Sequence, residues 1–382
     1  MIVRPLTEYC TLNMGQSPDS KTYNTQGNGL PFYQGNADFG ETHPITRVWC
    51  SAPVKVAEDG DILISVRAPI GAMNMAVERC CIGRGLAALT PIRNKCSKLF
   101  LYYALQSKVD SLIAQGTGST FKAISKKVLE ATCIPAYSTI EQVQIAEIIG
   151  RVDNTIAARR NQLVLLDQLV KSRFIELFGD PVRNSMGLPT EPMTTVCAII
   201  DGDRGKNYPK QDEFSDTGYC LFLNAKNVTA TGFSFENRMF ITKEKDNALH
   251  NGKLERGDVV LTTRGTLGNL AFYDDSVPFE NVRINSGMVI LRMKKSVMTE
   301  VFFMEQFKLQ LQSIKGKIAS GSAQPQLPIS TMSKIRILLA PMALQEQFAA
   351  FVEQTDKSKL AVQKGLQELE ILKKSLMQQY FG

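Results

Sequence analysis

The chain has 382 residues, of which 44% are hydrophobic and 21% are charged, and this composition is typical of globular proteins. A chain of this length is expected to form two or three domains, each large enough to bury a core. It shows no signal peptide and no uninterrupted apolar run of about 18 residues, so we expect a cytoplasmic protein without membrane contact. The net charge of +7 is compatible with a polyanionic partner, although solubility explains a charge of this size equally well.

The first part of the chain has the pattern of an α+β globule. Residues 58–71 predict a turn, a short apolar strand and a glycine-containing loop that is opened by Arg67. A second strand is predicted at residues 85–89, and a helix and a Gly-Ser loop at residues 116–120 follow it. Pro135 ends this segment.

A long helix is predicted next. Ser138 and Glu141 have the spacing of a capping box, and Gly179 is placed to end the helix. The apolar residues between them recur at alternating spacings of three and four, as in the seam of a coiled coil. We expect the seam of this helix to contain Ile149, Val152, Ile156, Leu163, Leu166 and Val170.

The second part of the chain repeats the first. Residues 255–268 have the pattern of residues 58–71, with Arg264 at the position of Arg67. A second strand, a helix and a loop with Gly and Ser follow in the same order. The closing helix at residues 347–382 has a seam of its own, which we expect to contain Val352, Val362, Leu366, Leu369 and Leu376.

The two long helices are copies of one another. Aligned from Gln144 and Gln347, they share the pairs Ala146/Ala349, Asp153/Asp356, Ala158/Ala361, Leu163/Leu366, Leu166/Leu369, Leu169/Leu372, Lys171/Lys374, Ser172/Ser375, Phe178/Phe381 and Gly179/Gly382. Average composition gives far fewer identities by chance. The sequence therefore predicts an α+β protein with an internal repeat, in which two α/β globules alternate with two long helices that pair as a coiled coil.

Four segments follow from these patterns. The predicted bounds are 1–137 for the first globule, 138–179 for the first long helix, 180–341 for a linker with the second globule, and 342–382 for the second long helix.

Motifs of the common catalytic sites are not found. His43 and His250 lie far apart, which leaves little from which to build a metal site or an acid–base pair. The loop at residues 202–207 lacks the spacing of a phosphate-binding loop, so we interpret it as an ordinary polar loop. The Asn-Pro-Pro-aromatic tetrapeptide of adenine methyltransferases does not occur. We expect no enzyme activity, no metal and no cofactor in this chain; if it acts on a polymer, it acts by binding.

Residues suited to reading nucleic acid gather in loops of both globules, because Arg, Lys, Asn and Gln can pair with base edges while Lys, Arg, Ser and Thr can contact phosphates. In the first globule the candidates are Gln34, Asn36, Arg67, Arg84, Thr117, Ser119 and Lys122. In the second globule they are Lys206, Lys210, Asn224, Lys226, Asn227, Arg264, Arg283, Asn285, Ser320, Ser322 and Gln324. For any one of them, a solvated surface side chain is an equally good interpretation.

Matched and unmatched candidates are expected to differ in role. Arg67 and Arg264 occupy matched positions, which favours phosphate contacts but is equally compatible with a shared structural ion pair. The unmatched residues Lys226, Asn227 and Gln324 are better candidates for base contacts.

This order of segments resembles the specificity subunit of type I DNA restriction-modification systems, across essentially the whole chain. The resemblance rests on the repeated Gly-Asp strand with its Arg loop, the Gly-Ser loop before a proline, the helix start at Gln144 and the leucine-rich helix end before Phe178-Gly179. Residues 172–181 are especially typical of that family.

The resemblance implies a non-catalytic protein. Each globule would read one half of a split, asymmetric target in double-stranded DNA. The two helices would pack antiparallel, set the spacer between the half-sites, and dock two methylation subunits that restriction subunits join. S-adenosylmethionine and methyl transfer would belong to the methylation subunits.

Two alternatives stay open on the sequence. The complex could methylate DNA without cutting it, which the partner proteins decide. The chain could instead be a structural scaffold that holds partners along a coiled-coil bar without reading DNA.

Overall fold

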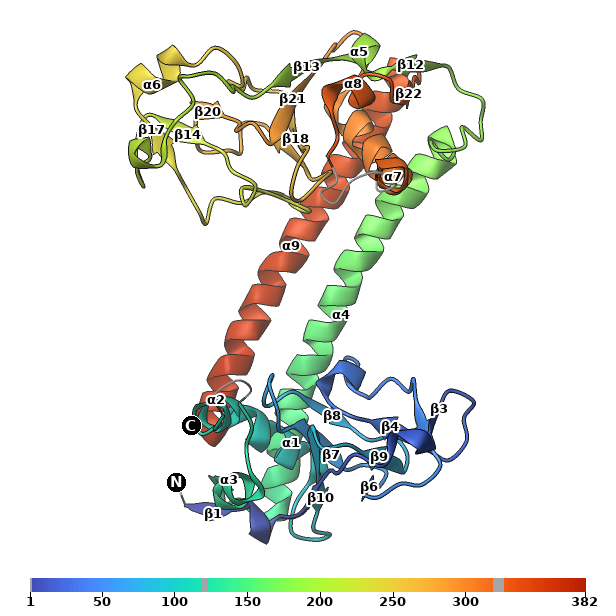
Figure 1. Cartoon of the computed structure of the whole chain (residues 1–382), viewed down its shortest axis with the longest axis vertical. Helices are drawn as coiled ribbons and strands as arrows, with labels where there is room; N and C mark the ends of the chain where they lie inside the picture. Colours follow the sequence, from blue (N-terminus) through green and yellow to red (C-terminus); the bar gives the residue numbers. More distant parts are fainter. Residues whose placement is uncertain (1, 119–121, 319–325) are drawn as a thin grey trace. The chain divides into compact units, whose positions relative to one another are not determined.

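The computed structural model describes residues 2–118, 122–318 and 326–382 (Figure 1). The chain forms two units with separate cores. The first unit contains Met1–Asn161 and Gln363–Gly382, and the second unit contains Gln162–Val362. Each long helix contributes a segment to both units, whereas the division predicted from the sequence keeps the helices whole.

Four antiparallel strands form the central sheet of the first unit, in the order β2, β10, β7, β8. Their bounds are Cys10–Met14, Leu86–Pro91, Ile62–Ser65 and Met73–Met75. β7 is buried along its whole length, which agrees with its continuous apolar sequence. The turn before β7 forms because Gly60 adopts a φ of 83° and the Asp61 carboxylate accepts a 2.8 Å hydrogen bond from the backbone N–H of Glu58.

A five-stranded sheet in the same unit has the order β3, β5, β4, β9, β6. The bounds are Tyr23–Asn24, Trp49–Cys50, Leu30–Tyr33, Cys80–Ile82 and Val56–Ala57. β4 and β9 are parallel, so the loops that follow them leave the sheet at the same edge. A separate antiparallel pair joins β1 (Val3–Pro5) to β11 (Cys133–Pro135).

The helices of the first unit share one core with its central sheet. They are α1 (Lys98–Ser107), α2 (Val109–Ala114), α3 (Lys126–Ala131) and parts of the long helices α4 (Thr139–Phe178) and α9 (Met342–Phe381). The end of α9 belongs to this core, since the ring of Phe381 lies 5.3 Å from that of Phe100 and its carbonyl accepts a 2.9 Å hydrogen bond from Lys108 Nζ.

The second unit repeats the central sheet of the first, but not its five-stranded sheet. Its central antiparallel sheet has the order β13, β21, β18, β19, with bounds Cys197–Asp201, Met288–Met293, Asp258–Thr262 and Leu270–Tyr273. β12 (Thr190–Pro192) pairs with β22 (Arg336–Leu338) as β1 pairs with β11. The remaining strands are β14 (Cys220–Phe222), which is parallel to β20 (Val282–Arg283), then β15 (Val228–Thr229), β16 (Gly232–Phe233) and β17 (Phe240–Ile241).

An aromatic cluster holds the helices of the second unit together. The shorter helices are α5 (Met193–Val196), α6 (Lys243–Ala248), α7 (Glu300–Ile318) and α8 (Ile329–Met332). The ring of Phe302 on α7 lies 5.4 Å from Phe174 and 4.7 Å from Phe178 on α4, and Phe348 on α9 lies 5.5 Å from Phe174. All four rings are fully buried.

Short 3-10 turns complete both units. They are η1 (Leu6–Glu8), η2 (Ser20–Thr22), η3 (Asn36–Asp38) and η4 (Gln211–Glu213).

Two buried glutamines show that the repeat extends to single hydrogen bonds. Gln142, in the first turn of α4, donates to the carbonyls of Lys95 and Tyr137 at 3.1 and 3.0 Å and accepts from the N–H of Ser97 at 2.9 Å. At the equivalent place, Gln345 of α9 is bonded to Val297, Ala340 and Thr299 in the same way. Each glutamine therefore attaches the start of a long helix to another segment of its unit. Gln142 joins α4 to the residues just before α1, and Gln345 joins α9 to the residues just before α7.

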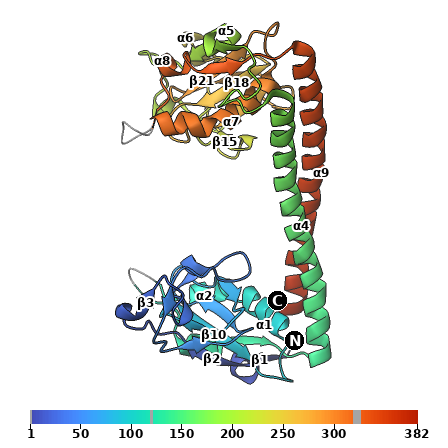
Figure 2. The same ribbon diagram turned by 90° about the vertical axis from the view of Figure 1, so that its right-hand side faces the viewer.

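The long helices contact each other within both units (Figure 1, Figure 2). In the first unit the Lys373 ammonium lies 2.7 Å from the Asp153 carboxylate, and Arg160 lies 2.8 Å from Glu370. In the second unit Lys359 lies 2.7 Å from Asp167. The predicted seam residues are all buried or half-buried, namely Ile149, Val152, Ile156, Leu163, Leu166, Val170, Val352, Val362, Leu366, Leu369 and Leu376.

The prediction of an α+β protein with an internal repeat is confirmed by the two equivalent sheets. Among the helices in the described part of the chain, none has the length and apolar character needed to cross a membrane.

Candidate nucleic-acid interface

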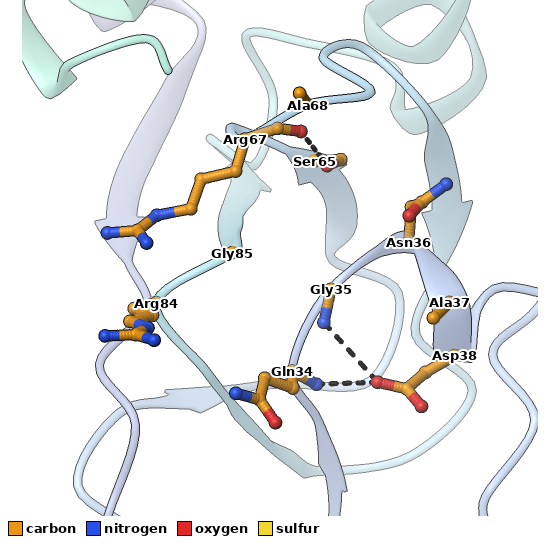
Figure 3. A pocket seen from close by; sticks show the side chains of 10 residues that line it. All are labelled: Gln34, Gly35, Asn36, Ala37, Asp38, Ser65, Arg67, Ala68, Arg84 and Gly85. Carbon is orange, nitrogen blue, oxygen red and sulfur yellow. Dashed lines mark hydrogen bonds between the residues drawn. The ribbon is translucent and has the colours of Figure 1, made fainter. Parts of the chain in front are cut away.

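A pocket of about 380 Å³ in the first unit brings together four of the predicted contact residues (Figure 3). Gln34 follows β4, Asn36 begins η3, Arg67 follows β7, and Arg84 lies between β9 and β10. The four side chains come from three loops that are distant in the sequence. The pocket is therefore formed where loops from different strands meet, and not by one continuous sequence motif.

The three loops meet because their backbones are joined. The N–H of Val66 donates to the carbonyl of Gly85 at 2.9 Å, and the N–H of Gly85 donates to the carbonyl of Gln34 at 3.1 Å. A Cβ atom on Gly85 would lie 2.4 Å from that same carbonyl oxygen, so only glycine permits this approach. The Asp38 carboxylate fixes the first loop by accepting a 2.7 Å hydrogen bond from the N–H of Gln34.

Two free guanidinium groups give the pocket its charge. The side chains of Arg67 and Arg84 are exposed and have no hydrogen-bond or ion-pair partner among the described residues. Figure 3 shows both groups extending toward the same side of the pocket. Asp38 is the one carboxylate among the lining residues, so positive charge remains in excess. Such a group of cations and amides can contact both phosphates and base edges.

Thr117 and Lys122 lie next to the Arg67 loop. Thr117 and Ala123 exchange backbone hydrogen bonds of 3.0 and 2.9 Å, and the N–H of Ala68 donates to the carbonyl of Lys122 at 3.1 Å. Both side chains are exposed. The predicted contact residue Ser119 lies outside the described residues.

Arg264, at the position equivalent to Arg67, lines a pocket in the second unit. This pocket has a volume of about 200 Å³ and is also lined by Asp201 and Arg204. Arg264 is exposed and has no partner among the described residues, as with Arg67. Arg204 is held in place, because its guanidinium donates to the Asp201 carboxylate at 3.1 Å and to the carbonyl of Ser286 at 3.3 Å.

A further pocket of the second unit, of about 430 Å³, is lined by Asn224, Lys226 and Arg238 together with Asp216 and Glu236. The side chain of Lys226 is exposed, and that of Asn224 is half-buried. Two more predicted residues, Lys206 and Lys210, are exposed in the loop that follows β13.

Asn227 has a structural role in the loop that carries Lys226. It is fully buried, and its amide donates to the carbonyls of Ser234 and Asn237 at 2.9 and 2.6 Å. Its oxygen accepts a 2.9 Å hydrogen bond from the N–H of Asn224. Both N–H groups of this amide are therefore used within the protein, and the side chain stabilises the loop.

Arg283 is likewise committed within the protein. The residue is 5% exposed, its guanidinium is paired with the Asp246 carboxylate, and it donates to the carbonyls of Asn251 and Leu249 at 2.7 and 3.1 Å. Burial alone would raise the pKa of Asp246, but hydrogen bonds from Lys253 and Arg283 outweigh burial and hold that pKa below its ordinary value.

Of the other predicted residues of the second unit, Asn285 makes a hydrogen bond within the protein, and three lie outside the described part of the chain. The Asn285 oxygen accepts a 2.9 Å hydrogen bond from the N–H of Gly287, which shapes the turn before β21. Ser320, Ser322 and Gln324 lie outside the described residues.

Sequence reasoning passed over Arg204 and Arg238, which line the two pockets of the second unit. Arg204 lies in the loop at residues 202–207, from which only Lys206 was predicted as a contact residue. The place of Arg204 shortly after an apolar strand is the sequence signal that could have identified it, as for Arg67 and Arg264, which follow β7 and β18. Nothing in the sequence around Arg238 sets it apart from other exposed arginines.

A family model described as the type I restriction modification DNA specificity domain matches the chain at residues 1–166 and 194–371. The two matched regions together cover most of the chain. Each contains one of the two central sheets.

Two similar proteins come from Methanocaldococcus jannaschii. One carries the name "Putative type I restriction enzyme MjaX specificity subunit". It is 40% identical over 164 residues, which is 43% of this chain and 39% of that relative. The MjaIX type I restriction enzyme specificity subunit is 22% identical over 400 residues, which covers 95% of this chain and 88% of that relative. The matched region thus spans well under half of the first relative and most of the second.

A solved structure shares the fold along the whole chain. The crystal structure of a type I restriction-modification system S subunit from M. genitalium is 17% identical and has a TM-score of 0.60, and the match covers 100% of this chain and 96% of that one.

Proposed function

Because the chain belongs to the family of type I restriction-modification DNA specificity domains, we propose that it is the non-catalytic subunit through which such a complex recognises double-stranded DNA. The observation that carries the proposal is the pair of exposed arginines Arg67 and Arg264, which follow equivalent strands of the two central sheets. Neither has a partner among the described residues, and each lies in a polar pocket with a second arginine.

Each globule reads one half of a bipartite target. The recognition domains are residues 1–137 and 180–341, whose central four-stranded sheets have equivalent strand orders. Their loops differ after the parallel strand, where the first carries Gln34 and Asn36 and the second carries Asn224 and Lys226. A shared scaffold with different side chains at the pocket is what an asymmetric target requires of a protein with two similar halves.

The long helices at residues 138–179 and 342–382 pair as an antiparallel coiled coil that sets the distance between the half-sites. The ion pairs support this direction, because Asp153 meets Lys373 while the later residue Arg160 meets the earlier residue Glu370. Lys373 and Lys359 interrupt the apolar seam, and both are satisfied by carboxylates of the facing helix.

The DNA-facing set is narrower than the one predicted from the sequence. In the first domain it comprises Gln34, Asn36, Arg67, Arg84, Thr117 and Lys122, and in the second Lys206, Lys210, Asn224, Lys226 and Arg264. Asn227 and Arg283 are left out because burial and internal hydrogen bonds engage them, and Asn285 because its oxygen is bonded to the N–H of Gly287. The predicted residues Ser119, Ser320, Ser322 and Gln324 lie outside the described part of the chain.

The partners follow from the type of complex. Two methylation subunits bind this chain, one at each domain, and restriction subunits join them. S-adenosylmethionine binds the methylation subunits, and the present chain selects the DNA on which they act.

The experiment is co-expression with a candidate methylation subunit, followed by mapping of N6-methyladenine in host DNA at single-base resolution. We expect a bipartite motif with a fixed gap that disappears when this chain is omitted. A stable complex that neither binds nor methylates DNA would support the scaffold function instead.

A further inference from the structure

Loops of the two units can be compared residue by residue from the strand registers. In the first unit Met14, the last residue of β2, lies opposite Ala87 of β10. In the second unit Asp201, the last residue of β13, lies opposite Val289 of β21. These four residues therefore define equivalent positions in the loops that follow β2 and β13 and in the turns that precede β10 and β21.

An arginine and a serine have exchanged places between these loops. Ser17 is the third residue after β2, whereas Arg204 occupies that position after β13. Conversely, Arg84 lies three residues before Ala87, and Ser286 lies at the matching position before Val289. The two positions touch in both units: the N–H of Arg84 donates to Ser17 Oγ at 3.3 Å, and Arg204 donates to the carbonyl of Ser286 at 3.3 Å.

A second arginine is fixed by the scaffold in both units. Ser65 lies opposite Leu86, and Thr262 lies opposite Met288, so Arg67 and Arg264 are equivalent as the second residue after each of these positions. Each pocket is thus lined by two guanidinium groups and one carboxylate, Asp38 in the first and Asp201 in the second. Both pockets keep one positive charge in excess.

The pair of arginines is retained although the loop that supplies one of them has changed, whereas the carboxylates come from different places, Asp38 from the loop after β4 and Asp201 from the end of β13. The side chains suited to base reading differ between the units, because the half-sites of an asymmetric target differ. A pair of arginines that both units keep at the pocket serves a feature that both half-sites share. In duplex DNA that shared feature is the phosphate backbone, which carries no sequence information.

We propose that each pocket is a two-arginine clamp for one backbone phosphate of DNA, formed by Arg67 with Arg84 in the first unit and by Arg264 with Arg204 in the second. This inference rests on the proposed function and assigns a ligand to these four side chains. Two guanidinium groups around one phosphate can each donate two hydrogen bonds to its oxygens, which fixes the position of the duplex before bases are read.

The test uses the complex of the full chain with its methylation subunit and compares two duplexes, one with the mapped target and one with the same bases scrambled. We expect Arg84→Ser to weaken binding to both duplexes by a similar factor, about tenfold. The slope of log affinity against log salt concentration should fall by about one, because one phosphate contact is lost. The control Arg93→Ala removes an exposed arginine beyond the other end of β10 and should leave both affinities and the slope unchanged.

The double variant Ser17→Arg with Arg84→Ser separates the clamp from general damage. It places the arginine in the first unit as the second unit has it, so we expect affinity and salt slope to return to within about threefold of the wild type, with the methylation motif unaltered. A double variant that binds as weakly as Arg84→Ser contradicts the clamp.

Two other results also overturn the inference. If the Arg84→Ser variant binds both duplexes with wild-type affinity, Arg84 makes no contact with a phosphate. A loss confined to the target duplex, with one motif position relaxed, would make Arg84 a reader of a base, most simply guanine. A wild-type complex that binds neither duplex refutes the proposed function itself, and the clamp falls with it.

Discussion

Arg264 and Arg283 show how far the environment decides the role of one residue type. Arg264 is exposed and has no partner among the described residues. Arg283 is buried, and its guanidinium is engaged by Asp246 and by the carbonyls of Leu249 and Asn251. The first arginine is available to an external anion, whereas the second joins β20 to the segment around α6.

Substitution of Arg283 should therefore affect stability, and substitution of Arg264 should affect DNA binding. We expect Arg283→Ala to lower the free energy of unfolding of the chain by about 3–5 kcal/mol, because Asp246 keeps its charge in a buried place with one partner fewer. Arg264→Ala should change that free energy by no more than about 0.5 kcal/mol while weakening DNA binding by the complex. Urea unfolding followed by circular dichroism measures the first quantity. Equal destabilisation by both variants would show that Arg264 is structural as well.

The sequence predicts which residue types are suited to the pocket, but not which of them are exposed. Arg67 could be proposed because it follows a predicted strand, and strand ends lie at a sheet edge, whereas Gln34 was proposed from its residue type. Asn227 and Arg283 were also proposed from their residue type. Their burial depends on partners such as Asp246, which a local sequence pattern does not reveal. The contacts of the Arg204 guanidinium with Asp201 and Ser286 also depend on segments brought together by the fold, which a local pattern does not reveal.

At the scale of elements, Gln142 and Gln345 are the places where a long helix is attached to its globule. Each lies in the first turn of its helix, is almost fully buried, and bonds to the segment before α1 or α7. A buried amide that satisfies several backbone groups fixes direction more strictly than apolar packing does. We infer that these two glutamines set the angle at which each globule leaves its helix.

Gln142→Leu tests this role with little change in volume. The carbonyls of Lys95 and Tyr137 and the N–H of Ser97 would lose their partner, so we expect a loss of roughly 1–3 kcal/mol in the free energy of unfolding. Gln144→Leu is the matched control, because Gln144 is exposed on the same helix and its replacement should be close to neutral. The measurement is again urea unfolding. A variant as stable as the control would rule out the attachment role.

The long helices were the most predictable elements of the fold. The capping box is present, since the Glu141 carboxylate accepts a 2.8 Å hydrogen bond from the N–H of Ser138, and Gly179 has a φ of 76° at the other end of α4. Two-residue strands such as β3 and β15 were not predicted. Their pairing depends on neighbours brought by the fold, and two residues are too few for a period to be recognised.

At the scale of the whole chain, duplication and divergence act on different parts. The central sheets, the attachment glutamines and the helix seams are retained in both halves. The loops after the parallel strands have changed, and one arginine is supplied from another loop. Under the proposed function, a protein built in this way keeps the geometry that two half-sites share while each half reads its own bases.

The proposed coiled coil makes the distance between half-sites depend on helix length. One heptad inserted at equivalent places in both α4 and α9 adds about 10 Å, since each helical residue rises about 1.5 Å, and it keeps the apolar seam in register. Because one turn of duplex, 10–10.5 base pairs, is about 34–36 Å long, the gap in the methylation motif should widen by about three base pairs. Three base pairs also rotate the duplex by about 100°, so modification should be weaker than in the wild type.

Mapping of N6-methyladenine in cells that express the lengthened chain with its methylation subunit measures this gap. A heptad inserted in α4 alone is the control: it would leave seam residues without facing partners and should abolish modification. An unchanged gap in the doubly lengthened variant would show that the helices do not set the spacing. A widened gap with both half-site sequences retained would establish that the helices measure distance while the two domains, which carry the arginine pairs, read the DNA.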